Sequence, residues 1–172
     1  YLLTLSVQAL YQRALKVRSA VPHPKIMGII RECGGKMHMS EGKIGYDHFC
    51  YHVQAEAENW KEAQSDFFES FRNYDEAGSL QRIQVLKYLV LTTMLMGSDI
   101  NPFDSQETKP YKNDPRIAAM TDLVDAYQRE DIHSYERILQ NNRDLLADPF
   151  IAENIDEVTR NMRTKAVLKL VA

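Results

Sequence analysis

Residues Asn59–Tyr74 read NWKEAQSDFFESFRNY, and this stretch guides the interpretation of the whole chain. Its apolar side chains recur every three or four residues, which places them on one face of an α-helix. They are Trp60, Ala63, Phe67, Phe71 and Tyr74. Aromatic and alanine residues in this arrangement are typical of the first helix of a tetratricopeptide-like hairpin. The stretch therefore predicts a helix that buries one face against a neighbouring helix.

Helical spacing continues on both sides of this stretch. Further apolar stripes start at Val7, Ile26, Ile117, Ile132 and Ile151, and residues 80–96 are apolar nearly all round. About seven helices joined mostly by short turns make sequential helices antiparallel neighbours. We therefore predict an all-α fold, a right-handed α-solenoid of tetratricopeptide-like helical hairpins, as a single domain over residues 1–172.

Boundary signals agree with these stripes. Asp114-Pro115 and Asp148-Pro149 each combine an N-cap residue with a proline suited to the first helical turn. Gly78-Ser79 supplies a glycine that ends one helix and a serine that starts the next. These signals predict helix starts near residues 115 and 149 and a helix end near residue 78.

One predicted helix contains unfavourable residues. Its apolar stripe consists of Ile26, Ile29, Ile30, Cys33 and Met37, so we expect Cys33 to be a small core residue. Gly28, Gly34 and Gly35 lie in the same helix, where each costs ~1 kcal/mol relative to alanine. The glycines predict either the close approach of a neighbouring backbone or a kink at residues 34–35.

The polar segment Asn101–Arg116, NPFDSQETKPYKNDPR, separates two of the predicted helical regions. Its three prolines exclude a continuous helix, and a connection this long is either disordered or a shaped surface. A loop that only connects has little need for aromatic residues. We predict partner contacts by Phe103, Lys109, Tyr111 and Lys112. The alternative is that Phe103 and Tyr111 fold back over the helix ends.

Composition excludes some classes of function. The net charge of −3 gives no reason to expect nucleic-acid binding, and Val85–Met96, the longest apolar run, is too short to span a bilayer. Residues 1–40 hold six basic and one acidic residue, whereas residues 41–78 hold three basic and nine acidic. This asymmetry suggests either ends that meet different partners or a solvated helix face. Because the chain starts at Tyr1 rather than methionine, we expect it to be a fragment.

Residues that could carry chemistry are few. His48, Cys50 and His52 alternate along the chain, and Cys33 or His38 could complete a tetrahedral zinc set, but the spacing of strong zinc motifs is missing. The Glu130-x-x-His133 pattern occurs once, whereas di-iron bundles need two copies. We therefore predict a chain that is not an enzyme and holds no metal or cofactor.

Several idiosyncratic stretches resemble a known family. They are Ser19–Met39 (SAVPHPKIMGIIRECGGKMHM), Asp66–Gly78 (DFFESFRNYDEAG), Leu86–Met96 (LKYLVLTTMLM) and Asn101–Pro115 (NPFDSQETKPYKNDP). Together they make the chain similar to the PCI-domain subunits of the COP-9 signalosome. The paralogous proteasome lid subunit, which lacks the Asn-Pro-Phe-Asp loop, is the alternative.

The resemblance implies the helical part of a PCI domain, with the winged-helix module absent from this chain. It also implies a non-catalytic scaffold in a complex that removes NEDD8 from cullins, in the nucleus and cytoplasm. The implied partners are the other signalosome subunits and cullin–RING ubiquitin ligases. The chain departs from the family pattern at Ser40–Asn59, SEGKIGYDHFCYHVQAEAEN, an apparent inserted loop, helix extension or gene-model artefact.

Overall fold

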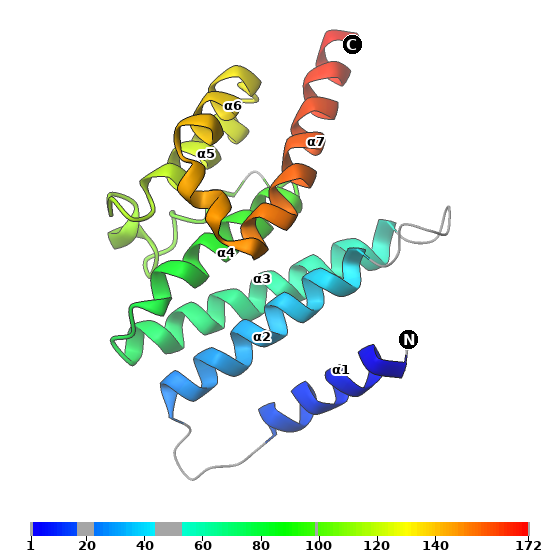
Figure 1. The fold of residues 1–172 in the computed structure, drawn as a ribbon, viewed down its shortest axis with the longest axis vertical. Coiled ribbons are helices and arrows are strands. Elements are labelled where there is room, and N and C mark those ends of the chain that lie inside the picture. Colours follow the sequence, from blue (N-terminus) through cyan, green and yellow to red (C-terminus); the bar gives the residue numbers. More distant parts are fainter. Residues whose placement is uncertain (1, 17–22, 44–52, 99, 172) are drawn as a thin grey trace. The chain divides into compact units, whose positions relative to one another are not determined.

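A computed structural model of the chain describes residues 2–16, 23–43, 53–98 and 100–171. The described residues contain helices and no strands, which confirms the all-α prediction (Figure 1). The chain was expected to form one domain, and the structure groups it into two compact units, Tyr1–Leu86 and Lys87–Ala172. The division falls inside helix α4 (Gln81–Leu95). The right-handed solenoid geometry stays a prediction.

The first unit contains α1 (Leu2–Leu15), α2 (Pro24–Lys43) and α3 (Val53–Glu76). Helices α2 and α3 pack side by side as an antiparallel hairpin (Figure 1). Four of the five residues predicted for the buried face of α3 are buried, since Ala63, Phe67, Phe71 and Tyr74 are all 0% exposed. Trp60, the fifth, is half-buried. Burying three aromatic side chains stabilises this hairpin by several kcal/mol, at roughly 1.5–3 kcal/mol for each large apolar side chain.

Helix α2 meets these aromatic rings with its glycines. A Cβ atom at Gly35 would lie 2.6 Å from Cε1 of Phe67, and one at Gly28 would lie 2.8 Å from Cδ1 of Tyr74. Both distances are far below van der Waals contact, so a side chain at either position would displace a ring of α3. The glycines therefore admit aromatic side chains rather than the neighbouring backbone that the sequence suggested, and α2 continues without a break from Pro24 to Lys43.

The apolar stripe predicted for α2 was mostly on the wrong face. Met37 is buried, but Ile26 is 57% exposed, Ile29 is 45% exposed and Cys33 is an exposed free cysteine. Pattern analysis counts apolar side chains, and a glycine adds none although its backbone can line a packed interface. The face of α2 that carries the glycines packs against α3, because the rings of Phe67 and Tyr74 occupy the space where side chains would otherwise be.

Both neighbouring helices extend into Ser40–Asn59. Helix α2 continues to Lys43 and α3 begins at Val53, so residues 40–43 and 53–59 are helical. Residues 44–52 lie outside the described part of the chain. The helix-extension alternative therefore accounts for both ends of this segment.

The second unit comprises the end of α4, α5 (Ala118–Gln128), α6 (Ile132–Asn141) and α7 (Pro149–Val171). Two 3₁₀ helices lie between them, η2 (Lys109–Tyr111) and η3 (Arg143–Ala147). Fully or nearly fully buried side chains from each α-helix form its core, namely Leu91, Met94, Met120, Leu123, Tyr135, Ile151, Val158 and Met162. The stripes predicted at residues 117–127 and 151–162 are buried as expected.

Two of the three predicted helix boundaries are confirmed. Gly78 has φ +64° and ends α3, with Ser79 N–H donating to Tyr74 O over 2.8 Å. Asp148 caps α7, because its Oδ1 accepts from the N–H groups of Phe150 and Ile151. The Asp114 prediction was wrong, since α5 starts at Ala118 and Asp114 accepts instead from the N–H of Arg116 in a turn. In the described parts of the chain, none of the helices has the length and apolar character required to cross a membrane.

Candidate protein-binding site

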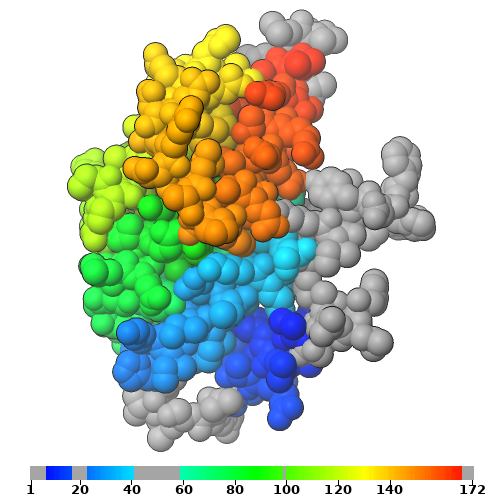
Figure 2. Space-filling model, in the orientation of Figure 1, coloured from blue at the N-terminus to red at the C-terminus, as the bar shows by residue number. Residues whose placement is uncertain are grey.

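Residues 101–116 form a loop that holds its own shape. Oδ1 of Asn101 accepts from Phe103 N–H over 2.9 Å, which closes a tight turn at the start. Backbone bonds follow from Lys109 N–H to Ser105 O and from Tyr111 N–H to Thr108 O. The segment forms part of the surface visible in Figure 2. Of the two alternatives that the sequence left open, the structure has the shaped surface.

Thr108 is the polar centre of this loop. It is 0% exposed, and its hydroxyl lies 2.6 Å from Pro102 O and 2.8 Å from Oγ of Ser105. Its N–H also donates to Oγ of Ser105 over 3.2 Å. A buried hydroxyl with several hydrogen-bond partners fixes the chain around it, because opening the loop would leave these groups unsatisfied. The loop therefore presents its outer side chains from a defined backbone.

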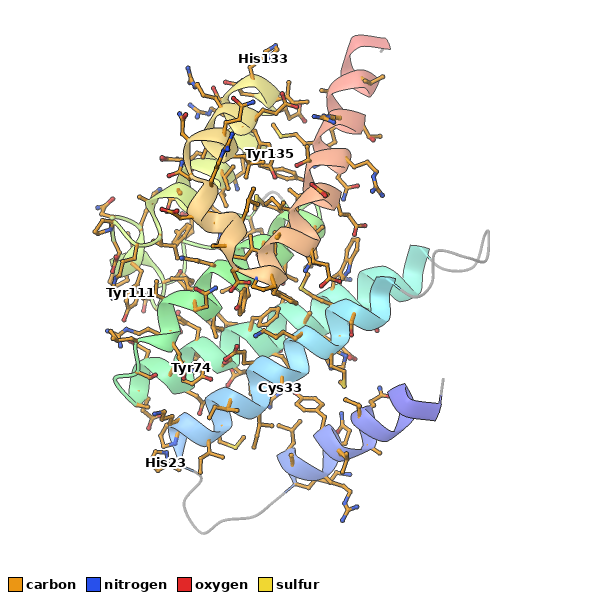
Figure 3. All side chains as sticks on the ribbon, viewed as in Figure 1. His23, Cys33, Tyr74, Tyr111, His133 and Tyr135 are labelled. Atoms are coloured by element: carbon orange, nitrogen blue, oxygen red, sulfur yellow. The ribbon has the colours of Figure 1, made fainter. Side chains whose placement is uncertain are left out.

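The four predicted contact residues differ in exposure. Phe103 is 1% exposed, so its ring belongs to the interior and offers a partner no surface. Lys109 is exposed, whereas Tyr111 and Lys112 are half-buried. Figure 3 labels Tyr111 on this loop. For Phe103, the alternative that the ring folds back into the protein is therefore the one the structure has. Partner binding by Lys109, Tyr111 and Lys112 stays a prediction.

The exposed residues of the loop carry both signs of charge, Asp104 and Glu107 as well as Lys109. Neither Lys109 nor Lys112 forms an ion pair with another described residue. The nearby carboxylate of Asp114 is already occupied, since Arg116 donates to it through Nε over 2.9 Å and Nη2 over 2.6 Å. Two ammonium groups beside a half-buried phenol can bind carboxylates and cover an apolar edge.

The candidate metal ligands are not brought together where the structure describes them. His48, Cys50 and His52 lie outside the described residues. Nε2 of His38 lies 3.5 Å from Oδ2 of Asp66, and His133 is exposed in the first turn of α6. Among the described residues, no three His, Cys, Asp or Glu side chains are grouped closely enough to hold a metal ion.

Sequence reasoning missed a buried polar cluster that joins α1, α2 and α3. The hydroxyl of Tyr11 donates to the Asp66 carboxylate over 2.6 Å, and Nη1 of Arg31 donates to Oδ1 of Asp66 over 2.6 Å. Burial and the hydrogen bond to Asp66 raise the pKa of the Tyr11 phenol well above its usual value. Gly34 makes room for the cluster, because a Cβ there would lie 2.6 Å from Oδ2 of Asp66. The pair Gly34-Gly35 was the signal in the sequence, but it did not indicate which side chains would pack against it.

Helical hairpins joined by short turns are the architecture of helical-repeat proteins, which bind other proteins along their surfaces. No family model matches the chain. It is 78% identical over 166 residues to COP9 signalosome complex subunit 2 of Emericella nidulans, covering 96% of this chain and 30% of that protein. The same subunit of Neurospora crassa is 75% identical, over 96% of this chain and 31% of its own length. The chain is therefore a homologue of one segment of COP9 signalosome complex subunit 2.

The chain spans about a third of the length of the curated relatives that it matches. A more distant similarity also exists. The probable 26S proteasome regulatory subunit rpn-6.2 of Caenorhabditis briggsae is 24% identical over 122 residues, which are 68% of this chain and 30% of that protein. The signalosome subunit is thus matched far more strongly than the proteasome subunit.

Proposed function

We propose that this chain is part of a non-catalytic scaffold subunit of the COP9 signalosome. In this role it supports the removal of NEDD8 from cullins, and so the regulation of cullin–RING ubiquitin ligases, by binding other proteins. Its partners are the other signalosome subunits and the ligases, and its locations are the nucleus and the cytoplasm. The observation that carries the proposal is the 78% identity to a relative named as a signalosome subunit.

The geometry of the loop supports a role in binding. Lys109, Tyr111 and Lys112 are held on a hydrogen-bonded backbone, so little conformational entropy is lost when they meet a partner. Tyrosine is among the residue types that dominate binding energy at protein interfaces, and lysines beside it can add charge complementarity. The loop is therefore the part of the second unit that we assign to partner contact.

The proposal is tested by expressing the full-length protein with an affinity tag and identifying what co-purifies by mass spectrometry. We expect the other signalosome subunits and cullins. Recovery of proteasome lid subunits in their place would keep the fold and replace the function. Recovery of neither set would overturn the proposal.

The loop is tested in the same assay with charge reversals. Lys109→Glu combined with Lys112→Glu should reduce recovery of at least one partner by about tenfold, because each lost charge pair costs about 1 kcal/mol or more once desolvated. Lys25→Glu combined with Lys61→Glu is the matched control, since both lysines are exposed on helices of the first unit. Equal recovery from the loop and control variants would rule out the loop as a contact.

A further inference from the structure

A groove in the second unit has no role in the proposal above. It is lined by Leu139, Gln140, Arg143, Leu146 and Ala147 and has a volume of about 560 Å³. These residues come from the last turn of α6 and from η3, where the chain turns from α6 back towards α7 (Figure 1). The groove is open to solvent and lies wholly on one unit.

Both walls of this groove are held in place. The α6 wall ends at Asn142, whose N–H and Nδ2 both donate to Ile138 O, over 3.0 and 2.8 Å. The η3 wall is anchored by Leu145, which is only 7% exposed. Beyond it, Oδ2 of Asp148 accepts from the Tyr88 hydroxyl over 2.8 Å. A groove that exists before binding loses little entropy when a ligand enters it.

The lining combines apolar side chains with an unpaired positive charge. Leu139, Leu146 and Ala147 supply the apolar surface, and Leu146 is 39% exposed. Arg143 is an exposed lining residue and pairs with no carboxylate among the described residues. Arg137, exposed and likewise unpaired within the described residues, lies one helical turn before the lining residue Gln140.

We propose that this groove binds a short segment of another protein that places an apolar side chain on Leu146 and a carboxylate on Arg143. Leucine-lined surface that stays open to water is stabilised by burial, which favours an apolar ligand group. A guanidinium group without a partner favours an acidic one, because it can donate two parallel hydrogen bonds to a carboxylate. Charge complementarity thus favours an acidic peptide over a basic one. The leucine-lined surface favours a peptide that carries an apolar side chain over a nucleic acid.

The test starts from a displayed library of random peptides selected on the 172-residue chain. The same library is selected in parallel on the Leu146→Asp variant, which replaces an exposed side chain and should fold normally by circular dichroism. We expect peptides that are enriched on the wild-type chain alone and that carry acidic residues next to leucine-like ones. The absence of such enrichment, or enrichment of basic peptides, would overturn the proposal.

The leading peptide is then synthesised with a fluorescent label, and its Kd is measured by anisotropy. Arg143→Glu should weaken binding by about tenfold or more, because it replaces an attractive charge by a repulsive one. Arg160→Glu is the matched control on α7 and should leave the Kd unchanged. Equal effects of the two reversals would refute the assignment of Arg143. Sedimentation showing a wild-type dimer that Leu146→Asp dissolves would give the groove to a second copy of the chain instead.

Discussion

Asp66 holds three helices of the first unit through one buried carboxylate. It is 4% exposed and accepts hydrogen bonds from Tyr11 of α1 and Arg31 of α2. A buried charge of this kind is stable only while its hydrogen-bond and ion-pair partners are present. A substitution of Asp66 therefore removes polar contacts of α3 with both α1 and α2 at once.

Replacing Asp66 by alanine should lower the free energy of unfolding by about 2–4 kcal/mol, because it removes the carboxylate that pairs with the Arg31 charge and accepts from the Tyr11 hydroxyl. Urea denaturation followed by circular dichroism measures the change. Tyr11→Phe removes the hydrogen bond to Asp66 and the longer one from Arg31 but keeps the Arg31–Asp66 ion pair, so it should cost only about 1 kcal/mol. An Asp66→Ala variant no less stable than Tyr11→Phe would show that the cluster does not join the helices.

At the scale of the element, α7 depends on its first residue pair. Asp148 caps the helix through Oδ1 and accepts from Tyr88 through Oδ2, and the rings of Tyr88 and Phe150 meet edge to face with centroids 4.8 Å apart. One side chain therefore both starts α7 and ties it to α4. Caps of this type contribute about 0.5–2 kcal/mol.

Asp148→Ala should lower the free energy of unfolding by about 2 kcal/mol, since both the cap and the bond to Tyr88 are lost. Asp148→Ser keeps the cap and should recover about half of this loss. Chemical denaturation followed by far-ultraviolet circular dichroism measures both variants. If the serine variant is as unstable as the alanine variant, the cap contributes nothing.

Short sequence signals predicted a helix start correctly where the capping contacts lie within a few residues of the signal. The pair Asp148-Pro149 starts a helix, whereas Asp114-Pro115 makes a turn in which the backbone and side chain of Arg116 both donate to the aspartate. The two pairs look alike in the sequence. They differ because the side chain of Arg116 donates to Asp114, and the direction of that side chain is set only in the folded loop.

Packing between elements was harder to predict. The stripe of α3 is buried as expected, but on α2 the sequence favoured Ile26, Ile29 and Cys33 over the glycines that meet Phe67 and Tyr74. In the candidate site, Phe103 and Tyr111 looked equivalent, and only Phe103 is fully buried. In both cases the outcome depends on space offered by a distant segment, which no local pattern records.

For the whole molecule, buried phenols predict how stability depends on pH. Burial is the largest cause that raises the pKa of Tyr11, Tyr74 and Tyr135 above that of an exposed tyrosine, near 10. Above about pH 10 the unfolded chain therefore loses protons that the folded chain retains. The contribution of these groups to stability is complete below that pH and is lost as the pH rises further.

Phenolate absorbance measured against pH should show that at least three of the nine tyrosines ionise only when the chain unfolds. Far-ultraviolet circular dichroism recorded on the same samples reports the unfolding. Tyr135→Phe is the control and should reduce the delayed part of the titration. Ionisation of all nine tyrosines before any loss of helicity would contradict the prediction.

The glycine face of α2 has a consequence for the order in which the chain folds. Three glycines in this 20-residue helix each cost ~1 kcal/mol, so α2 has little tendency to be helical by itself. It gains its stability from the rings of Phe67 and Tyr74, which come later in the chain. During synthesis, the region of α2 therefore leaves the ribosome before the segment it needs, and the hairpin can close only after residue 74 has emerged.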